Sequence, residues 1–252
     1  MTLDPAVAAV RLAVRRSLGD GATVLVACSG GADSLALLAA AVFEARDADL
    51  RVIGATVDHG LQAGSAEHAA AVVVQMAELG ADETATIRVT VDPGPAGIEA
   101  GAREARYAAL GQLAEHFGAG TVLIGHTRDD QAETVLLGLA RGSGGRSLAG
   151  MRPVFDFDGV AFVRPLLHLT REQTEAACTA EGISWWEDPH NTDPAFARVR
   201  VRRAVLPVLE AEIGPGVAAA LARTAAQLRA DTDFLDEYAE LEYESSDFAD
   251  GL

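Results

Sequence analysis

The sequence predicts an α/β fold, a Rossmann-like parallel sheet with helices on both faces, followed by a C-terminal helical segment. From residue 20 onward, short apolar runs alternate with segments of helical composition. Runs that are apolar throughout are typical of parallel strands buried on both faces. A Gly-rich turn also joins the first run to a helix, which is the position where such sheets bind ligands.

The elements of the predicted sheet follow one another regularly. Residues 1–20 have the pattern of an amphipathic helix and lack the features of a secretory signal. The predicted strands are residues 24–28, 51–57, 84–91 and 121–125, and the predicted helices are residues 35–45, 66–79, 98–117 and 129–140.

The chain after residue 140 is less regular. Residues 141–161 are Gly-rich and are interpreted as a functional loop or a hairpin. Residues 162–167 are expected to return to the sheet, and residues 170–182 to form a helix with Thr170 as its N-cap.

From Pro194 onward the composition is helical, first basic and then strongly acidic. The turn at residues 210–216 indicates a boundary. We therefore expect an α/β domain over residues 1–212 and a helical segment over residues 213–252.

The charge is unevenly distributed. The net charge is −17, which argues against a nucleic-acid partner if it is spread evenly. The last 22 residues, 231–252, hold nine carboxylates and neither Lys nor Arg. Four arginines, at positions 198, 200, 202 and 203, form a basic run that is suited to phosphates. A nucleic-acid partner is therefore compatible with the sequence.

Cysteine content and hydropathy indicate the compartment. Cys28 and Cys178 are the two cysteines, too few for a disulfide framework or a Cys-x-x-Cys metal motif. The longest strongly apolar stretch is far shorter than a membrane span. A cytoplasmic protein without a membrane partner is expected.

The turn after the first predicted strand has the features of a phosphate-binding loop. It reads Ser29-Gly30-Gly31-Ala32-Asp33-Ser34. Gly30 and Gly31 allow the backbone to approach an anion, and the N-terminus of the following helix favours negative charge. Asp33 is expected to hold Mg²⁺ against the phosphates. The loop does not match the Walker motif, since no Gly-Lys-Ser/Thr follows; the alternative is a capped turn without a ligand.

A second constellation follows the strand predicted at residues 121–125. His126, Asp130 and Glu133 are spaced so that a helix beginning here would carry them on one face. An acidic pair with a histidine suits metal binding or general base catalysis. The alternative is an acidic first turn that complements the helix dipole, which explains Asp130 but not His126 and Glu133.

Two smaller motifs lie at the same predicted edge. Asp58 and His59 follow the second strand, and Arg103 and Arg106 lie one turn apart on the long helix. The arginines suit a clamp on phosphate or on transition-state charge. Taken alone, the arginines are better explained as surface ion pairs with Glu99 or Glu104, and Asp58 with His59 is equally compatible with a solvated loop pair.

Together these motifs resemble those of the tRNA(Ile)-lysidine synthetase family, which belongs to the PP-loop ATP pyrophosphatases. The chain carries SGGADS, VDHGLQ, AREARY, HTRDDQAET, RGSGG, RPLL and DPHNTDPAFARVRVRR in the family's order across about residues 23–210. Three features depart from the family pattern: Gln62 replaces the usual Arg, Val199 and Val201 follow arginines where Asn is common, and relatives carry further C-terminal domains. Residues 213–252 are therefore expected to be the start of a linker or accessory domain that is either truncated or minimal.

The resemblance implies a fold of the adenine nucleotide α-hydrolase type and a two-step reaction. ATP would adenylate the 2-carbonyl oxygen of the wobble cytosine in the CAU anticodon of an isoleucine tRNA. Free L-lysine would then displace AMP to leave lysidine. The cofactors implied are ATP and Mg²⁺, and a homodimer is left open.

The resemblance also implies roles for the candidate residues. Residues 29–34 would bind pyrophosphate, with Asp58, His59 and Arg103 at the nucleotide. The remaining roles are Mg²⁺ binding for Asp33 and Asp130, α-phosphate stabilisation for Arg106, and assistance to the base or the lysine amine for His126 and Glu133. The arginines of residues 198–203, with Arg141, Arg146 and Arg152, would contact the tRNA.

Two other classes are compatible with parts of the sequence. One is another PP-loop synthetase, either tRNA-modifying or amide-forming; a thiolating enzyme is disfavoured because the chain lacks cysteine pairs. The other is a universal-stress-type ATP-binding module without catalytic activity, which would not need the residues around His126.

Overall fold

A six-stranded sheet with strand order β3-β2-β1-β4-β6-β5 organises the first part of the chain. The computed structural model describes residues 3–18, 23–46, 48–60, 64–90, 98–142 and 144–247. The strands are β1 (Thr23–Ala27), β2 (Arg51–Asp58), β3 (Glu83–Arg88), β4 (Thr121–Ile124), β5 (Val154–Phe157) and β6 (Val160–Val163). All neighbouring strands are parallel except β5, which pairs antiparallel with β6.

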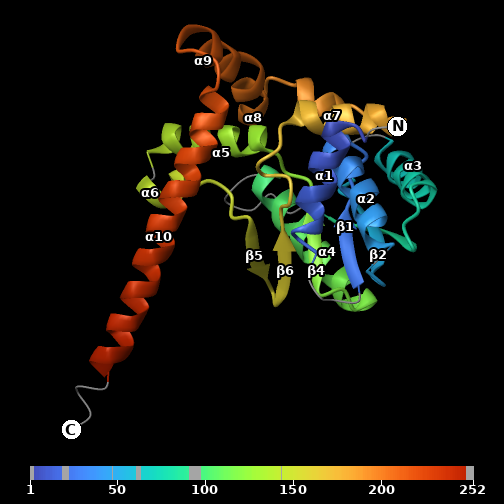
Figure 1. Ribbon diagram of the computed structural model, residues 1–252, viewed down its shortest axis with the longest axis horizontal. Coiled ribbons are helices and arrows are strands. Elements are labelled where there is room, and N and C mark those ends of the chain that lie inside the picture. The colour runs from blue at the N-terminus through green and yellow to red at the C-terminus, as the bar shows by residue number, and fades with distance from the viewer. Residues whose placement is uncertain are drawn as a thin grey trace. The chain divides into compact units, whose positions relative to one another are not determined.

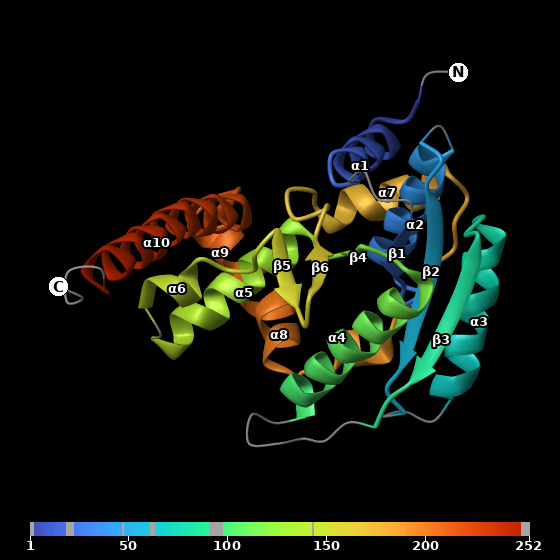
Figure 2. The same ribbon diagram turned by 90° about the horizontal axis from the view of Figure 1, so that it is seen from below.

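Helices cover both faces of this sheet (Figure 2). One face carries α1 (Pro5–Arg15), α2 (Ala32–Ala45), α3 (Ser65–Glu78) and α7 (Arg171–Ala180), and the other carries α4 (Ile98–Phe117). Alternate residues of β1 serve the two cores. Val24 and Val26 pack in the first, while Leu25 packs in the second with Leu110 of α4. The predicted α/β fold is confirmed.

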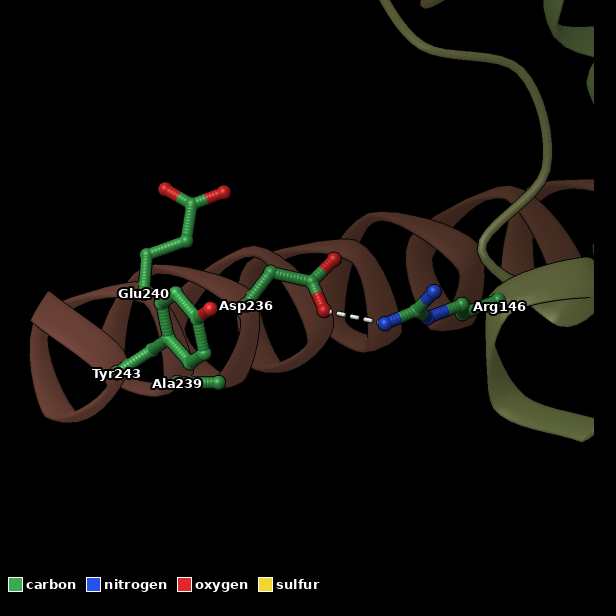
Figure 3. A pocket seen from close by; sticks show the side chains of 5 residues that line it. All are labelled: Arg146, Asp236, Ala239, Glu240 and Tyr243. Atoms are coloured by element: carbon green, nitrogen blue, oxygen red, sulfur yellow. Dashed lines mark hydrogen bonds and ion pairs between the residues drawn. The ribbon is translucent and has the colours of Figure 1, made fainter. Parts of the chain in front are cut away.

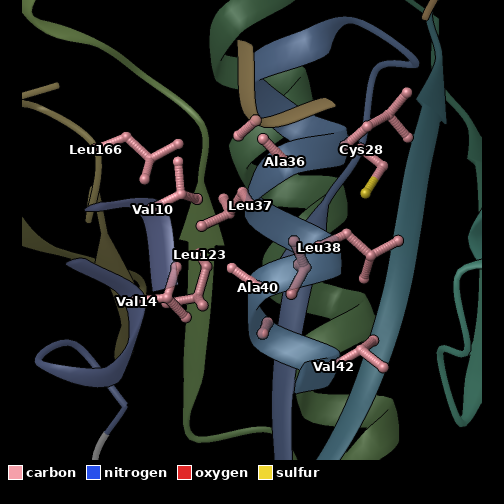
Figure 4. Close-up of a cluster of buried hydrophobic side chains, with 14 of the residues drawn as sticks. Val10, Val14, Cys28, Ala36, Leu37, Leu38, Ala40, Val42, Leu123 and Leu166 are labelled. Atoms are coloured by element: carbon pink, nitrogen blue, oxygen red, sulfur yellow. The ribbon is translucent and has the colours of Figure 1, made fainter. Parts of the chain in front are cut away.

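The larger core gathers around α2. Leu37 is fully buried, and Figure 4 shows it beside Val10 and Val14 of α1 and Leu123 of β4. The helix is apolar on nearly all sides, which is expected of a helix enclosed by neighbouring elements. This packing fixes the N-terminus of α2, where the predicted phosphate loop ends.

The chain divides into two compact units (Figure 1). The sheet unit comprises Met1–Thr127 and Pro153–Asp188, and the helical unit comprises Arg128–Arg152 and Pro189–Leu252. The predicted boundary at residue 212 stays a prediction.

The helical unit is built from short helices and one long one. They are α5 (Arg128–Arg141), α6 (Gly144–Leu148), the 3-10 helix η1 (Pro189–Thr192), α8 (Ala197–Arg200), the π-helix η2 (Val201–Val205), α9 (Leu206–Glu212) and α10 (Val217–Asp247). Ala132 of α5 packs with Val201 and Leu206 in a small core. Most of α10 beyond residue 230 is exposed.

The predicted elements differ from the observed ones mainly at their ends. The helix α2 begins at Ala32, three residues before the predicted start, since Gly31 serves as its N-cap. The Gly-rich region contains the expected hairpin, β5–β6, together with the short helix α6. The final parallel strand ends at Val163, so residues 164–167 lie beyond it.

Among the described residues, no single helix is long and apolar enough to cross a membrane. One bent pair, Ala197–Glu212 with Val217–Tyr243, passes the same test of length and composition when its helices are taken together.

Candidate active site

The predicted phosphate loop lies where the strand order reverses. The chain runs from β1 outward to β2 and β3 and then returns to place β4 on the other side of β1. At such a point the loops after neighbouring strands diverge and leave room for a ligand. A Cβ atom on Gly125 would lie 2.9 Å from the carbonyl oxygen of Asp33, so the loop after β4 passes directly against the start of α2.

The loop is curled by its own two serines. The backbone N–H of Ser29 donates to Ser34 Oγ over 3.1 Å, and that hydroxyl donates to the Gly31 carbonyl over 2.9 Å. Gly30 has φ +84°, in the left-handed region that favours glycine. The predicted strand, glycine turn and helix are therefore present in the expected order.

Two residues outside the motif contact the carbonyl groups of the loop. The Ser29 carbonyl lies 2.9 Å from His68 Nε2, and the Gly30 carbonyl accepts from the Trp186 backbone N–H at 2.9 Å. The rings of His68 and Trp186 pack with centroids 3.8 Å apart. Because a trans peptide directs its N–H opposite to its carbonyl, the N–H groups of Gly30 and Gly31 point away from this support. This is the orientation that an anion site needs.

Asp33 contacts α7. Its Oδ1 accepts from Thr174 Oγ1, and its Oδ2 lies 3.6 Å from Arg171 Nε. Among the described residues, no group of three or more His, Cys, Asp or Glu side chains is arranged to hold a metal ion. Mg²⁺ commonly uses one or two carboxylates plus phosphate oxygens, so the hard oxygen ligands of Asp33 fit that ion. Its predicted role as a metal ligand stays a prediction.

Asp58 shapes the end of β2. Its Oδ1 accepts from the Gly60 N–H over 2.9 Å, and its side chain is 5% exposed beside Arg88. The hydrogen bonds from Gly60 and then from Ser65 lower the pKa of this carboxyl. Asp58 is therefore not part of a solvated pair.

His59 and Arg106 are brought together although they are far apart in sequence. Burial first, and then the charge of Arg106, lower the pKa of His59. Arg103 and Arg106 both act on the pKa values of Tyr107 and Arg164. Residues of the motifs from β2 and α4 therefore influence one another electrostatically within the sheet unit, and their shared role at a nucleotide stays a prediction.

His126 does not lie on a helix. It follows β4 in the loop, and its backbone N–H donates to the Ile124 carbonyl over 3.0 Å. The helix α5 begins at Arg128, so the expectation that one helical face carries His126 together with Asp130 and Glu133 is wrong for the histidine.

Arg164, a residue not predicted as functional, is the partner of His126. Its Nε donates to His126 Nδ1 over 3.1 Å, and its Nη2 donates to the Tyr107 hydroxyl over 3.1 Å. Arg164 follows β6 and is 8% exposed, with its guanidinium carbon 4.2 Å from the Phe155 ring centroid. Arg164 begins the RPLL segment, which is the sequence signal that marks it.

Asp130 and Glu133 share one face of α5, as their spacing predicted. Both are buried, Glu133 completely. Arg202 binds both carboxylates: its Nε donates to Glu133 Oε1 over 2.6 Å, and its Nη2 reaches Glu133 Oε2 at 3.1 Å and Asp130 Oδ1 at 3.2 Å. The two-oxygen contact with Glu133 is the strong geometry for an arginine and a carboxylate.

The other arginines of the basic run have different environments. Arg198 donates to Thr134 Oγ1, and Arg200 donates to the carbonyls of Pro194 and Ala195. Arg203 is exposed. Of the four predicted tRNA contacts in this run, Arg200 and Arg203 are exposed, and Arg198 and Arg202 are partly buried.

Arginines of the Gly-rich segment pair with the acidic helix α10. Arg146 lies 2.5 Å from Asp236, and Arg152 lies 2.7 Å from Asp233. Arg229 of α10 also donates to the carbonyls of Ala149 and Gly150. The acidic tail thus has partners within its own unit.

A surface hollow of about 530 Å³ lies on α10. Figure 3 shows Arg146 and Asp236 joined across it. Its other lining residues are Ala239, Glu240 and Tyr243. None of the residues predicted to be catalytic or nucleotide-binding lines this hollow, so we do not interpret it as the active site.

Comparisons with known proteins agree with the motifs. Residues 9–209 match the PP-loop domain family. A tRNA(Ile)-lysidine synthase from Salinispora arenicola is 56% identical to this chain, covering 99% of the chain and 76% of the relative. One from Thermobifida fusca is 54% identical, covering 94% of the chain and 72% of the relative. A solved U34-tRNA thiolase from Methanococcus maripaludis has a TM-score of 0.73 at 18% identity, covering 88% of this chain and 79% of its own, which indicates a shared fold.

Proposed function

This chain belongs to the PP-loop family and, within it, to the tRNA(Ile)-lysidine synthases, and we propose that it is the ligase that forms lysidine at the wobble cytidine of the CAU anticodon of isoleucine tRNA. The observation that carries the proposal within the structure is the phosphate loop at the strand-order reversal, with its amide groups directed away from its supports.

The first half of the reaction is adenylation by ATP. Residues 29–34 bind the β and γ phosphates through backbone N–H groups, and the N-terminus of α2 adds favourable potential. Arg106, with Arg103, stabilises negative charge that develops on the α-phosphate. His59 lies beside Arg106, and with Asp58 it completes the nucleotide-binding set.

Mg²⁺ is the expected companion of ATP. Asp33, with Asp130 as a second ligand, would hold it, and the ion would supply charge neutralisation at the phosphates. Asp33 keeps its contacts to Thr174 and Arg171, which orient the carboxylate at the start of α2.

The second half is attack by free L-lysine on the activated C2 carbon, with departure of AMP. The lysine amine forms the new bond to carbon while the bond from carbon to the adenylated oxygen breaks, and one amine proton leaves. Asp130, Glu133 and Arg202 together carry one net negative charge. That charge suits a cationic ligand. We assign Glu133 and His126 to assisting the cytosine base or the lysine amine.

The alternative activities are less well supported. The two cysteines, Cys28 and Cys178, are both buried, and burial raises the pKa of the Cys178 thiol to about 12, so neither suits sulfur transfer. The relatives that are more than 50% identical are named as lysidine synthases, which disfavours a nucleotide sensor without catalytic activity.

Pyrophosphate release tests the donor half of the proposal. The protein is incubated with ATP, Mg²⁺ and an isoleucine tRNA transcript that carries CAU, without lysine. We expect release of pyrophosphate that depends on the transcript. A matched transcript with uridine at the wobble position is the control, and equal release with both transcripts contradicts the proposal.

A further inference from the structure

Arg164 donates a hydrogen bond to one of the two ring nitrogens of His126. A guanidinium group has five N–H donors and no acceptor, and in proteins it keeps its charge near neutral pH. Its Nε lies 3.1 Å from His126 Nδ1. In this hydrogen bond the arginine is the donor, so Nδ1 has to be the unprotonated nitrogen.

The consequence for the other ring nitrogen is direct. A neutral imidazole carries one proton, so His126 has it on Nε2 when Nδ1 accepts. Protonating Nδ1 as well would place an imidazolium against a guanidinium and remove the acceptor. His126 therefore offers a hydrogen-bond donor at Nε2 and has no lone pair there with which to act as a base.

Arg164 is itself held firmly. Its Nη2 donates to the Tyr107 hydroxyl over 3.1 Å, and its guanidinium stacks against the Phe155 ring. Tyr107 in turn packs edge-on against Phe155. Burial lowers the pKa of Arg164 while the neighbouring tyrosine opposes that change. These contacts with Tyr107 and Phe155 hold the guanidinium in one orientation. The direction of its Nε–H is therefore set by packing.

We infer that Arg164 is a positioning residue that holds His126 as a neutral Nε2–H donor, and that His126 acts in lysidine formation by donating a hydrogen bond to an oxygen that gains negative charge, rather than as a general base. This inference rests on the proposed function. An α-phosphate oxygen during adenylation, and the adenylated oxygen as it leaves C2 with AMP, both have the required chemistry. The donor role replaces the general-base role that the sequence had suggested for this histidine.

The tautomer of His126 can be measured directly. Protein labelled with ¹⁵N-histidine gives separate Nδ1 and Nε2 resonances whose shifts report which nitrogen is protonated, and a His126→Gln variant assigns the signals. We expect the wild type at about pH 7.5 to show an unprotonated Nδ1 and a protonated Nε2. A protonated Nδ1, alone or in an imidazolium, would overturn the inference without any assay of activity.

Variants then test the source of the preference. Arg164→Met should give mixed tautomers, whereas Tyr107→Phe removes the hydrogen bond between Arg164 and the Tyr107 hydroxyl and should leave the His126 tautomer unchanged. Arg164→Lys keeps a cationic hydrogen-bond donor and is the second variant to test if the Arg164→Met protein does not fold. A wild-type tautomer in a folded Arg164→Met protein would show that Arg164 does not set it.

The donor role is tested by two substitutions of His126. Gln presents an amide N–H near the place of Nε2 but accepts no proton, and Ala presents neither. We expect the single-turnover rate of lysidine formation in His126→Gln to stay within about tenfold of the wild type, and His126→Ala to be slower by a further ~10-fold or more. Equal losses in both variants contradict the donor role. Absence of lysidine formation in the wild type instead contradicts the proposed function and leaves the tautomer result standing.

Discussion

At the scale of single residues, Gly30 is a position that tolerates no side chain. Its φ of +84° suits glycine, and a Cβ atom there would lie 2.8 Å from Val72 and 2.9 Å from His68. Any side chain would strain the backbone and displace the histidine that supports the loop. The shape of the proposed phosphate loop therefore depends on Gly30 having no Cβ atom.

Gly30→Ala tests that dependence. We expect ATP affinity, measured by isothermal titration, to fall by at least ~10-fold because the loop N–H groups no longer converge. Gly120→Ala is a matched control, since a Cβ there meets nothing within 4 Å. Unchanged ATP affinity in Gly30→Ala would contradict the assigned phosphate site.

Arg202 and Arg203 are neighbours with different expected roles. Arg202 neutralises the buried Glu133, so Arg202→Met should lower the free energy of unfolding by about 3–5 kcal/mol. Arg203 is exposed, so Arg203→Ala should change stability by less than about 0.5 kcal/mol and weaken tRNA binding.

Both effects are measured on the same two proteins, by denaturant unfolding and by filter binding over a range of salt concentrations. If Arg203 contacts a phosphate, the slope of the logarithm of the binding constant against the logarithm of the salt concentration should be smaller by about one in the Arg203→Ala variant. Equal stability losses in the two variants, or unchanged tRNA binding in Arg203→Ala, would contradict this division of roles.

At the scale of elements, we expect the acidic helix α10 to compete with RNA for arginines of the Gly-rich segment. Asp233 and Asp236 pair with Arg152 and Arg146, two of the arginines predicted to contact tRNA. Exposed pairs of this kind contribute little to stability, so phosphates can replace the carboxylates at little cost to the fold.

The double variant Asp233→Asn/Asp236→Asn should bind tRNA more tightly, by about 3–10-fold at low salt, with unfolding free energy changed by less than about 1 kcal/mol. Glu237→Gln/Glu240→Gln removes the same charge from exposed positions of α10 and is the control. If both double variants tighten binding equally, the net charge of the helix explains the effect and the specific pairs do not.

At the scale of the whole molecule, local patterns predicted the sheet and the order of its motifs. Apolar runs and glycine turns depend on neighbouring residues, so β1, the phosphate loop and α2 were foreseeable. The spacing of Asp130 and Glu133 likewise predicted their shared face.

Contacts between distant segments were not foreseeable from local patterns. His68 and Trp186 support the phosphate loop from α3 and from the chain after α7, and no spacing rule connects them to Ser29 and Gly30. Arg202 and Glu133 are likewise 69 residues apart. His126 was wrongly predicted to lie on a helix because its spacing from Asp130 and Glu133 is helical. The helix α5 begins two residues after His126, at Arg128.

The proposed function is tested by the formation of lysidine itself. The protein is incubated with ATP, Mg²⁺, labelled L-lysine and an isoleucine tRNA transcript bearing CAU, and the RNA is digested to locate the label. We expect label on the wobble nucleotide with one AMP formed per lysine, and no label on a transcript with uridine at that position. RNA that stays unlabelled while ATP binds normally would contradict it.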